Sequence, residues 1–214
     1  MRSGMTACWM PIALSSDLPA ASVMPIATPA GALALWRSAS GRLTAAADRC
    51  PHRGMRLSHG FVRGEALSCI YHGWSYDASG RCVRIPAHPN LTPGQSICVA
   101  TRAVDETGGI IWLAEERPEA PVPRLAGLSP VRSLTVDAPL PAVEAAAGAK
   151  ADAVGHIART DGAPGFLLAA QPDRRTLVHV LVAEAAGPAE RVAASRAAEA
   201  LRRAAEAIRE EIAA

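Results

Sequence analysis

Lysine is almost absent from this sequence, and long apolar runs are missing altogether. Lys150 is the single lysine among 22 basic residues, and basic and acidic residues nearly balance, with a net charge of +2. Without a basic run, the chain lacks the electrostatic footprint of a nucleic-acid-binding protein. No apolar run approaches the roughly 20 residues of a membrane-spanning helix. We therefore expect neither nucleic acid nor a membrane as a partner.

Cysteine is also scarce. The five cysteines are an odd number, which does not suggest a disulfide framework, and free thiols fit a reducing cytoplasm. Cys8, Trp9 and Pro11 interrupt the apolar stretch near the N-terminus, so we expect no signal peptide there. The expectation is a cytoplasmic protein in which Cys8, Cys82 and Cys98 are small buried hydrophobes.

Aromatic residues are few and nearly all precede residue 113, with only Phe166 after it, so the best-specified core should lie in the first half. Short apolar segments separated by Gly-containing turns predict strands in this half. Their spacing is typical of an all-β sandwich or a small barrel. The predicted strands cover 32–37, 42–46, 60–64, 65–71, 97–104 and 109–114.

The second half of the sequence predicts a connector, a few strands and a long helix. Residues 117–141 are rich in proline and predict a connector, and three further strands are expected at 132–137, 166–170 and 176–182. The segment 188–214 predicts a long helix whose apolar face carries Leu201, Ala205, Ile208 and Ile212. We expect this helix to dock on its own domain, with subunit pairing as the alternative.

Two segments pair a cysteine with a histidine, C50-P-H-R-G54 and C69-I-Y-H-G-W74. Two thiolates and two imidazoles suit either zinc or a two-iron cluster. Structural zinc sites usually keep like ligands together, whereas here each segment mixes them as C-x-H and C-x-x-H. A two-iron cluster with one thiolate-bound and one imidazole-bound iron needs this division. Buried cysteines with chance histidines are the remaining alternative. Gly54 and Gly73 allow tight turns that leave the histidine tips near the surface.

The segments 48–54, 57–60, 69–77 and 80–82, with Ile85 and Pro86, closely resemble the Rieske domain of Rieske non-haem iron oxygenases. The resemblance implies a mainly β fold, a Rieske-type antiparallel β-sandwich with a cluster-binding loop subdomain, followed by a small α+β remnant that ends in a long helix. It implies a tail at 1–6, a Rieske domain at 7–116, a connector at 117–141 and a shortened oxygenase-like segment at 142–214, with its helix at 188–214.

The resemblance also implies a [2Fe–2S] cluster with Cys50 and Cys69 on one iron and His52 and His72 on the other. Arg53, Trp74 and Tyr76 are expected beside the cluster, Tyr76 as a hydrogen-bond donor or as a core aromatic. Respiratory relatives carry an extra cysteine in each loop, whereas this chain has Met55 and Tyr71 there. They also carry a serine where this chain has Trp74, so we expect a potential at the low end of the Rieske range, roughly −150 to +300 mV.

Full-length relatives hold a mononuclear iron with two histidines and one carboxylate. If residues 143–156 correspond to the helix that supplies those ligands, Glu144 keeps the first acid, while Gly148 and Ala151 replace two of the ligand-motif residues. We therefore expect no mononuclear iron, although an improvised site from Asp152, His156 and His179 stays open.

These observations favour an electron-transfer protein that carries one electron from a flavin or iron–sulfur reductase to a separate catalytic oxygenase subunit. The chain would then be an oxidoreductase component and not an oxygenase by itself. One alternative is a small or heteromeric Rieske oxygenase with an unorthodox or partner-completed iron site. Another is a non-catalytic redox sensor. A homo-oligomer and a hetero-oligomer both stay open.

Overall fold

The structure is a computed structural model that describes residues 8–158 and 163–213, with side chains described as far as Arg209. The described chain divides into two compact units. One contains residues 16–105 and 113–117, and we call it the loop unit. The other contains residues 8–15, 106–112, 118–158 and 163–213 and is called the helical unit. The domain boundaries expected from the sequence stay a prediction.

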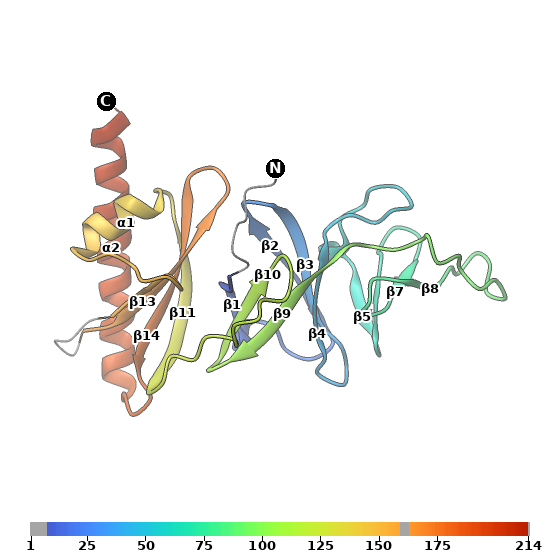
Figure 1. Cartoon of the computed structure of the whole chain (residues 1–214), viewed down its shortest axis with the longest axis horizontal. Helices are drawn as coiled ribbons and strands as arrows, with labels where there is room; N and C mark the ends of the chain where they lie inside the picture. The colour runs from blue at the N-terminus through green and yellow to red at the C-terminus, as the bar shows by residue number, and fades with distance from the viewer. Residues whose placement is uncertain (1–7, 159–162, 214) are drawn as a thin grey trace. The chain divides into compact units, whose positions relative to one another are not determined.

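The loop unit is built on an antiparallel sheet with the strand order β9-β4-β3-β2. Its strands are β2 (Ser22–Thr28), β3 (Gly31–Arg37), β4 (Leu43–Ala47) and β9 (Thr101–Thr107). Ala34, Trp36 and Ala46 of β3 and β4 point into one hydrophobic core, as alternate residues of paired strands do. Figure 1 shows these strands in blue and green.

A second, smaller antiparallel sheet completes the loop unit. It has the order β5-β6-β7-β8, with β5 (Phe61–Arg63), β6 (Ala66–Ser68), β7 (Ser75–Tyr76) and β8 (Cys82–Arg84). A short 3-10 helix, η2 (Leu57–His59), precedes β5. Leu57, Leu67 and Tyr76 of these elements share the core of the larger sheet. Such short strands are stabilised mainly by this packing, because they form few ladder hydrogen bonds of their own.

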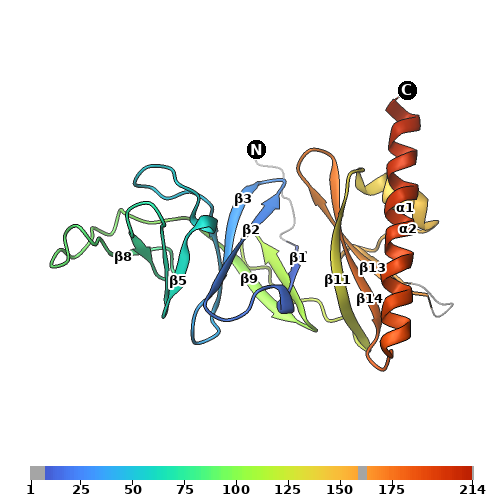
Figure 2. The same cartoon turned by 180° about the vertical axis from the view of Figure 1, so that it is seen from behind.

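The helical unit is a four-stranded antiparallel sheet with the order β11-β14-β13-β12. The strands are β11 (Leu128–Val136), β12 (His156–Ile157), β13 (Gly165–Gln171) and β14 (Arg175–Ala183). The helices α1 (Leu140–Ala147) and α2 (Pro188–Ala213) lie together on one face of this sheet (Figure 2). β1 (Met10–Leu14) and the first residues of β10 (Ile110–Ala114) also belong to this unit.

The long helix docks on its own unit, as expected. Leu201 and Ala205 are buried against the sheet, and Ile208 is partly buried in the same core. The side chain of Ile212 lies outside the described residues. An amphipathic face that meets a sheet explains why this segment is a stable helix.

The expected fold class is confirmed: the chain is mainly β, with antiparallel sheets and a long final helix. The burial of Cys82 is also confirmed, but Cys8 and Cys98 are exposed, so that expectation was wrong for them. Cys98 forms an isolated β-bridge with Arg81, and its neighbour Val99 takes the core-facing position. Cys8 likewise directly precedes the buried Trp9. Within the described residues, no helix is long and apolar enough to cross a membrane.

Candidate metal centre

Two loops of the small sheet bring the predicted ligands together. The first loop, residues 50–55, follows β4, and the second loop, residues 69–74, connects β6 to β7. The connections that contain them lie side by side in both views of the ribbon (Figures 1 and 2).

The two loops have the same backbone hydrogen bonds, although their sequences differ. In the first loop, Cys50 N donates to Met55 O at 2.8 Å and Gly54 N donates to Cys50 O at 2.8 Å. In the second loop, Cys69 N donates to Trp74 O and Gly73 N donates to Cys69 O, both at 2.9 Å. Each loop therefore closes on its own cysteine through the same turn.

A glycine in the left-handed region makes each turn possible. The φ angles are +72° for Gly54 and +68° for Gly73, which L side chains rarely adopt. At Gly73 there is also no room, because an added Cβ would lie 2.9 Å from Cγ of Pro86. The glycines predicted to allow tight turns have this role in the structure.

The thiols and the imidazoles differ sharply in exposure. Cys50 and Cys69 are each 2% exposed, whereas His72 is exposed and His52 is half-buried. The two imidazole rings lie edge to face with their centroids 4.7 Å apart. The histidine tips therefore lie at the surface, as the sequence predicted, and the sulfur atoms lie beneath it.

Polar groups of the protein point at both sulfur atoms. Tyr76 Oη lies 3.1 Å from Cys50 Sγ, and the backbone N–H groups of Tyr71 and His72 face Cys69 Sγ. Burial raises the pKa of Cys69, and the neighbouring Cys50 raises it further. Burial likewise raises the pKa of Tyr76, so that the phenol keeps its proton and can donate. Tyr76 is thus both a core aromatic and a hydrogen-bond partner of a predicted ligand.

Trp74 and Arg53 lie beside His52. The indole of Trp74 stacks on the imidazole of His52, with ring centroids 4.4 Å apart and an interplanar angle of 3°. Arg53 is exposed. The partial burial of His52 lowers the pKa of this imidazole, and the nearby charges of His72 and Arg53 lower it further. The stacking connects the two loops through side chains, and sequence reasoning did not foresee it.

A buried carboxylate supports the first loop. Asp48 lies two residues before Cys50, and its Oδ1 and Oδ2 accept hydrogen bonds from Ser58 N and Ser58 Oγ, both at 2.7 Å. These bonds hold η2 against the start of the loop. Under the second loop, the hydroxyls of Ser68 and Ser75 are 2.9 Å apart.

The donor set fits a cluster that needs two thiolates and two imidazoles. Two buried sulfur atoms with N–H and O–H groups facing them suit an anionic ligand pair, since such donors stabilise negative charge on sulfur. Over the described ranges 8–158 and 163–213, no group of three or more His, Cys, Asp or Glu side chains could hold a single metal ion.

The structure does not bring Asp152, His156 and His179 together as one site. His156 on β12 and His179 on β14 both pair with Leu167 of β13, so one strand separates them. The carboxylate of Asp152 accepts hydrogen bonds from the backbone N–H groups of Val154 and His156 and shapes a turn.

The helix register considered for residues 143–156 was wrong beyond its first residues. α1 ends at Ala147 because Gly148 adopts φ +65° and caps it, and His156 lies on a strand. Glu144 does lie on α1. Its carboxylate accepts hydrogen bonds from Lys150 Nζ at 2.7 Å and from Ala151 N at 3.0 Å, so it fastens the loop after the helix.

Comparisons with known proteins agree with this geometry. Residues 8–101 match the family model of the Rieske [2Fe-2S] domain. The oxidoreductase NdmD of Pseudomonas putida is 40% identical over 111 residues, which cover 51% of this chain and 19% of that protein. A 4beta-methylsterol monooxygenase of Methylococcus capsulatus is 40% identical over 116 residues, covering 49% of this chain and 31% of that protein. The chain thus spans about a fifth to a third of these relatives.

A similar fold extends over both units. The crystal structure of apo dicamba monooxygenase matches with a TM-score of 0.78 and 19% sequence identity, covering 97% of this chain and 86% of that one. At this identity the likeness shows the fold alone. The matched domain implies a [2Fe–2S] cluster, and with the curated relatives it supports an electron-transfer or oxygenase-type Rieske protein. Residues 8–101 of the chain therefore match the Rieske [2Fe–2S] domain.

Proposed function

We propose that Cys50, His52, Cys69 and His72 hold the [2Fe–2S] cluster and that the chain is an electron carrier. Cys50 and Cys69 would bind one iron, and His52 and His72 the other. The observation that carries this proposal is the shared backbone turn of the two loops, which brings two buried thiols and two surface imidazoles together.

When bound, the cluster supplies a reversible one-electron couple. The residues around the cluster would exclude water, stabilise charge and orient the ligands. The buried thiols exclude water from the sulfur side, and Tyr76 and the N–H groups of the second loop stabilise negative charge there. Trp74 fixes the plane of the His52 ring. The exposed position of His72 leaves a short path from the imidazole side to a docked protein.

As an electron carrier, the protein would accept one electron from a flavin or iron–sulfur reductase and pass it to a separate oxygenase component. Relatives such as an oxidoreductase and monooxygenases support a place in such a system. All five cysteines are free thiols, although Cys8 and Cys98 are exposed, and this favours a reducing compartment such as the cytoplasm. The partners would make a hetero-oligomer at least transiently.

A second candidate is an oxygenase whose mononuclear iron site is completed by another subunit. It is favoured by the helical unit, because the likeness to an oxygenase fold extends over nearly the whole chain. In that case the helical unit would contribute scaffold and some of the ligands would come from elsewhere.

Metal analysis of anaerobically purified protein separates these functions. The carrier should contain two irons and two acid-labile sulfides per chain and give a paramagnetic signal after one-electron reduction. A third iron without additional sulfide, together with oxygen consumption on a substrate, would indicate the oxygenase. A single zinc ion, or no signal after reduction, would contradict the proposed cluster.

A further inference from the structure

Two exposed apolar side chains lie in the second loop itself, directly before His72. Among the described residues, six large hydrophobic side chains are exposed, and five of them belong to the loop unit between residues 61 and 91. Ile70 and Tyr71, which directly precede His72 in the second loop, are 58% and 56% exposed. Exposed apolar side chains next to a proposed metal ligand indicate a surface that another molecule covers. The other exposed side chains are Phe61, Val83, Leu91 and, in the helical unit, Val192.

The segment that contains the two loops carries a net positive charge. Residues 48–100 contain six arginines and three acidic residues, which gives 6 − 3 = +3. All six arginines are exposed, whereas the carboxylate of Asp48 is buried and lies 3.9 Å from Nε of Arg56. The other two acids are bound within the unit, Glu65 to Ser40 and Asp77 to its own turn. The arginines are Arg49, Arg53, Arg56, Arg63, Arg81 and Arg84.

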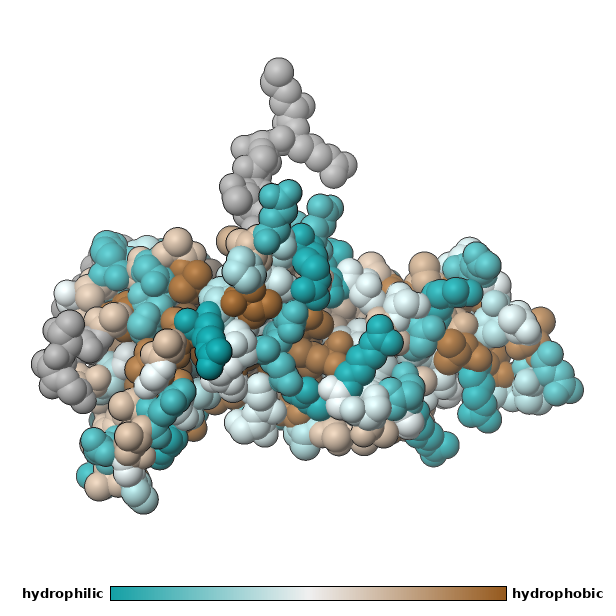
Figure 3. Space-filling model, turned by 60° about the horizontal axis from the view of Figure 1, so that its bottom comes forward, coloured by the Kyte–Doolittle hydropathy of each residue, from teal (hydrophilic) through white to brown (hydrophobic). Residues whose placement is uncertain are grey.

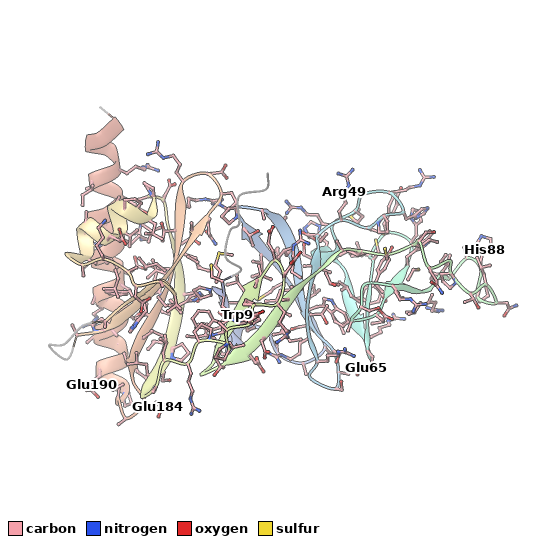
Figure 4. The ribbon with its side chains drawn as sticks, in the orientation of Figure 1. Trp9, Arg49, Glu65, His88, Glu184 and Glu190 are labelled. Atoms are coloured by element: carbon pink, nitrogen blue, oxygen red, sulfur yellow. The ribbon has the colours of Figure 1, made fainter. Side chains whose placement is uncertain are left out.

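Two of the arginines lie on the first loop itself. An added Cβ at Gly54 would lie 3.4 Å from Nε of Arg49, so this guanidinium covers the turn, and Arg53 follows His52 directly. Neither Arg49 nor Arg53 forms an ion pair with a carboxylate in the part of the chain that the structure describes. Figure 4 shows Arg49 on the loop side of the unit and Glu65 well away from it. The carboxylate of Glu65 therefore does not neutralise the arginines of the first loop.

We propose that this surface, with Ile70 and Tyr71 at its centre and Arg49 and Arg53 at its rim, docks an acidic redox protein. Figure 3 brings forward the side of the loop unit that faces down in Figure 1, and there hydrophobic residues are scattered among hydrophilic ones. An apolar centre with a cationic rim fits a partner whose own redox group is surrounded by carboxylates, because opposite charges steer the encounter and desolvated apolar contacts hold it. The inference rests on the proposed electron-carrier function and names the kind of partner. The partner loses one electron, and this protein gains it.

The test uses the full chain with its cluster and an acidic flavodoxin as the probe. Calorimetry at low and high salt measures the dissociation constant of the complex, and stopped flow measures oxidation of the reduced flavodoxin. Binding should weaken by about tenfold or more on raising the salt. Arg53→Glu should weaken it by about tenfold at low salt, since the change replaces attraction by repulsion. Ile70→Ser should weaken it at both salt concentrations.

Arg196→Glu is the matched control, because Arg196 is exposed on α2 in the other unit. Equal effects of Arg53→Glu and Arg196→Glu, or binding that does not respond to salt, would overturn the docking surface even if electrons still pass. Salt-dependent binding that Arg53→Glu abolishes, without any electron transfer, would support the surface and contradict the carrier function. Self-association that Arg53→Glu removes would instead identify an interface between copies of this chain and overturn the proposal.

Discussion

The free energy of unfolding should fall in mild acid because of His179. This side chain on β14 is fully buried, and its Nδ1 is 2.7 Å from Ser133 Oγ. Burial lowers the pKa of His179 to about 4, against a smaller opposing contribution from the Pro11 carbonyl. Nε2 has no hydrogen-bond partner of adequate geometry among the described residues. The protonated ring carries an N–H at both nitrogens, so its charge would be buried with little compensation.

The direction in which pH changes the free energy of unfolding follows from the protonation of His179 in the folded and in the unfolded chain. The unfolded chain takes up a proton near the ordinary pKa of 6.5, whereas the folded chain resists protonation down to about 4. The stabilisation from the neutral imidazole is therefore complete above pH 6.5 and is lost as pH falls through this window. The full difference corresponds to about 3 kcal/mol, and about 2 kcal/mol should already be lost at pH 5.

Urea unfolding followed by circular dichroism at pH 8 and pH 5 measures this loss. The comparison is with His179→Asn, whose amide can keep a hydrogen bond to Ser133 but does not titrate. Wild type should lose about 2 kcal/mol more than the variant between these pH values. The exposed His88 provides the control, and His88→Gln should keep the wild-type difference. If wild type and His179→Asn lose equal stability, burial does not lower the pKa of His179 and the reasoning is refuted.

Three further predictions concern the candidate metal centre. Tyr76→Phe removes the hydrogen bond to the buried thiol and should lower the midpoint potential by about 50 mV in a spectroelectrochemical titration, with an unchanged potential as the contradicting result. Trp74→Ala removes the stack on His52 and should speed cluster loss to a chelator about fivefold, with Trp74→Phe close to wild type; equal rates would mean that the stack has no such role. Gly73→Ala should reduce the iron bound per chain, because its Cβ has neither room nor a favourable φ. The control is Gly64→Ala, because Gly64 has φ +57° but open space around it. This variant should lose only about 1 kcal/mol of stability and keep its iron. Iron loss in both variants would assign the effect to backbone strain alone.

The fold class could be predicted because the informative signals are local. Turn residues and short apolar runs mark β3 and β4, and the period of Leu201, Ala205 and Ile208 marks α2. Strand and helix periodicity needs only neighbours in sequence. The exposure of Cys8 and Cys98 could not be predicted in this way, because burial depends on which distant segment covers a residue.

At the candidate metal centre the sequence predicted the residues but not their contacts. The cysteine–histidine spacing identifies four candidate ligands. The glycine four residues after each cysteine indicates that both loops form the same turn. The stack of Trp74 on His52 and the bonds from Asp48 to Ser58 depend on how two loops and η2 meet in space. The separation of His156 and His179 likewise follows from strand pairing, which sequence spacing alone does not reveal.

The repeated turn has a consequence for how the metal site is assembled. Since each loop closes through hydrogen bonds to its own cysteine, neither loop requires iron or the other loop to adopt its shape. The conformational entropy of both ligand arms is then lost when the chain folds, and little of it is lost when the metal arrives. Apoprotein with such preorganised loops should therefore accept a cluster without first refolding.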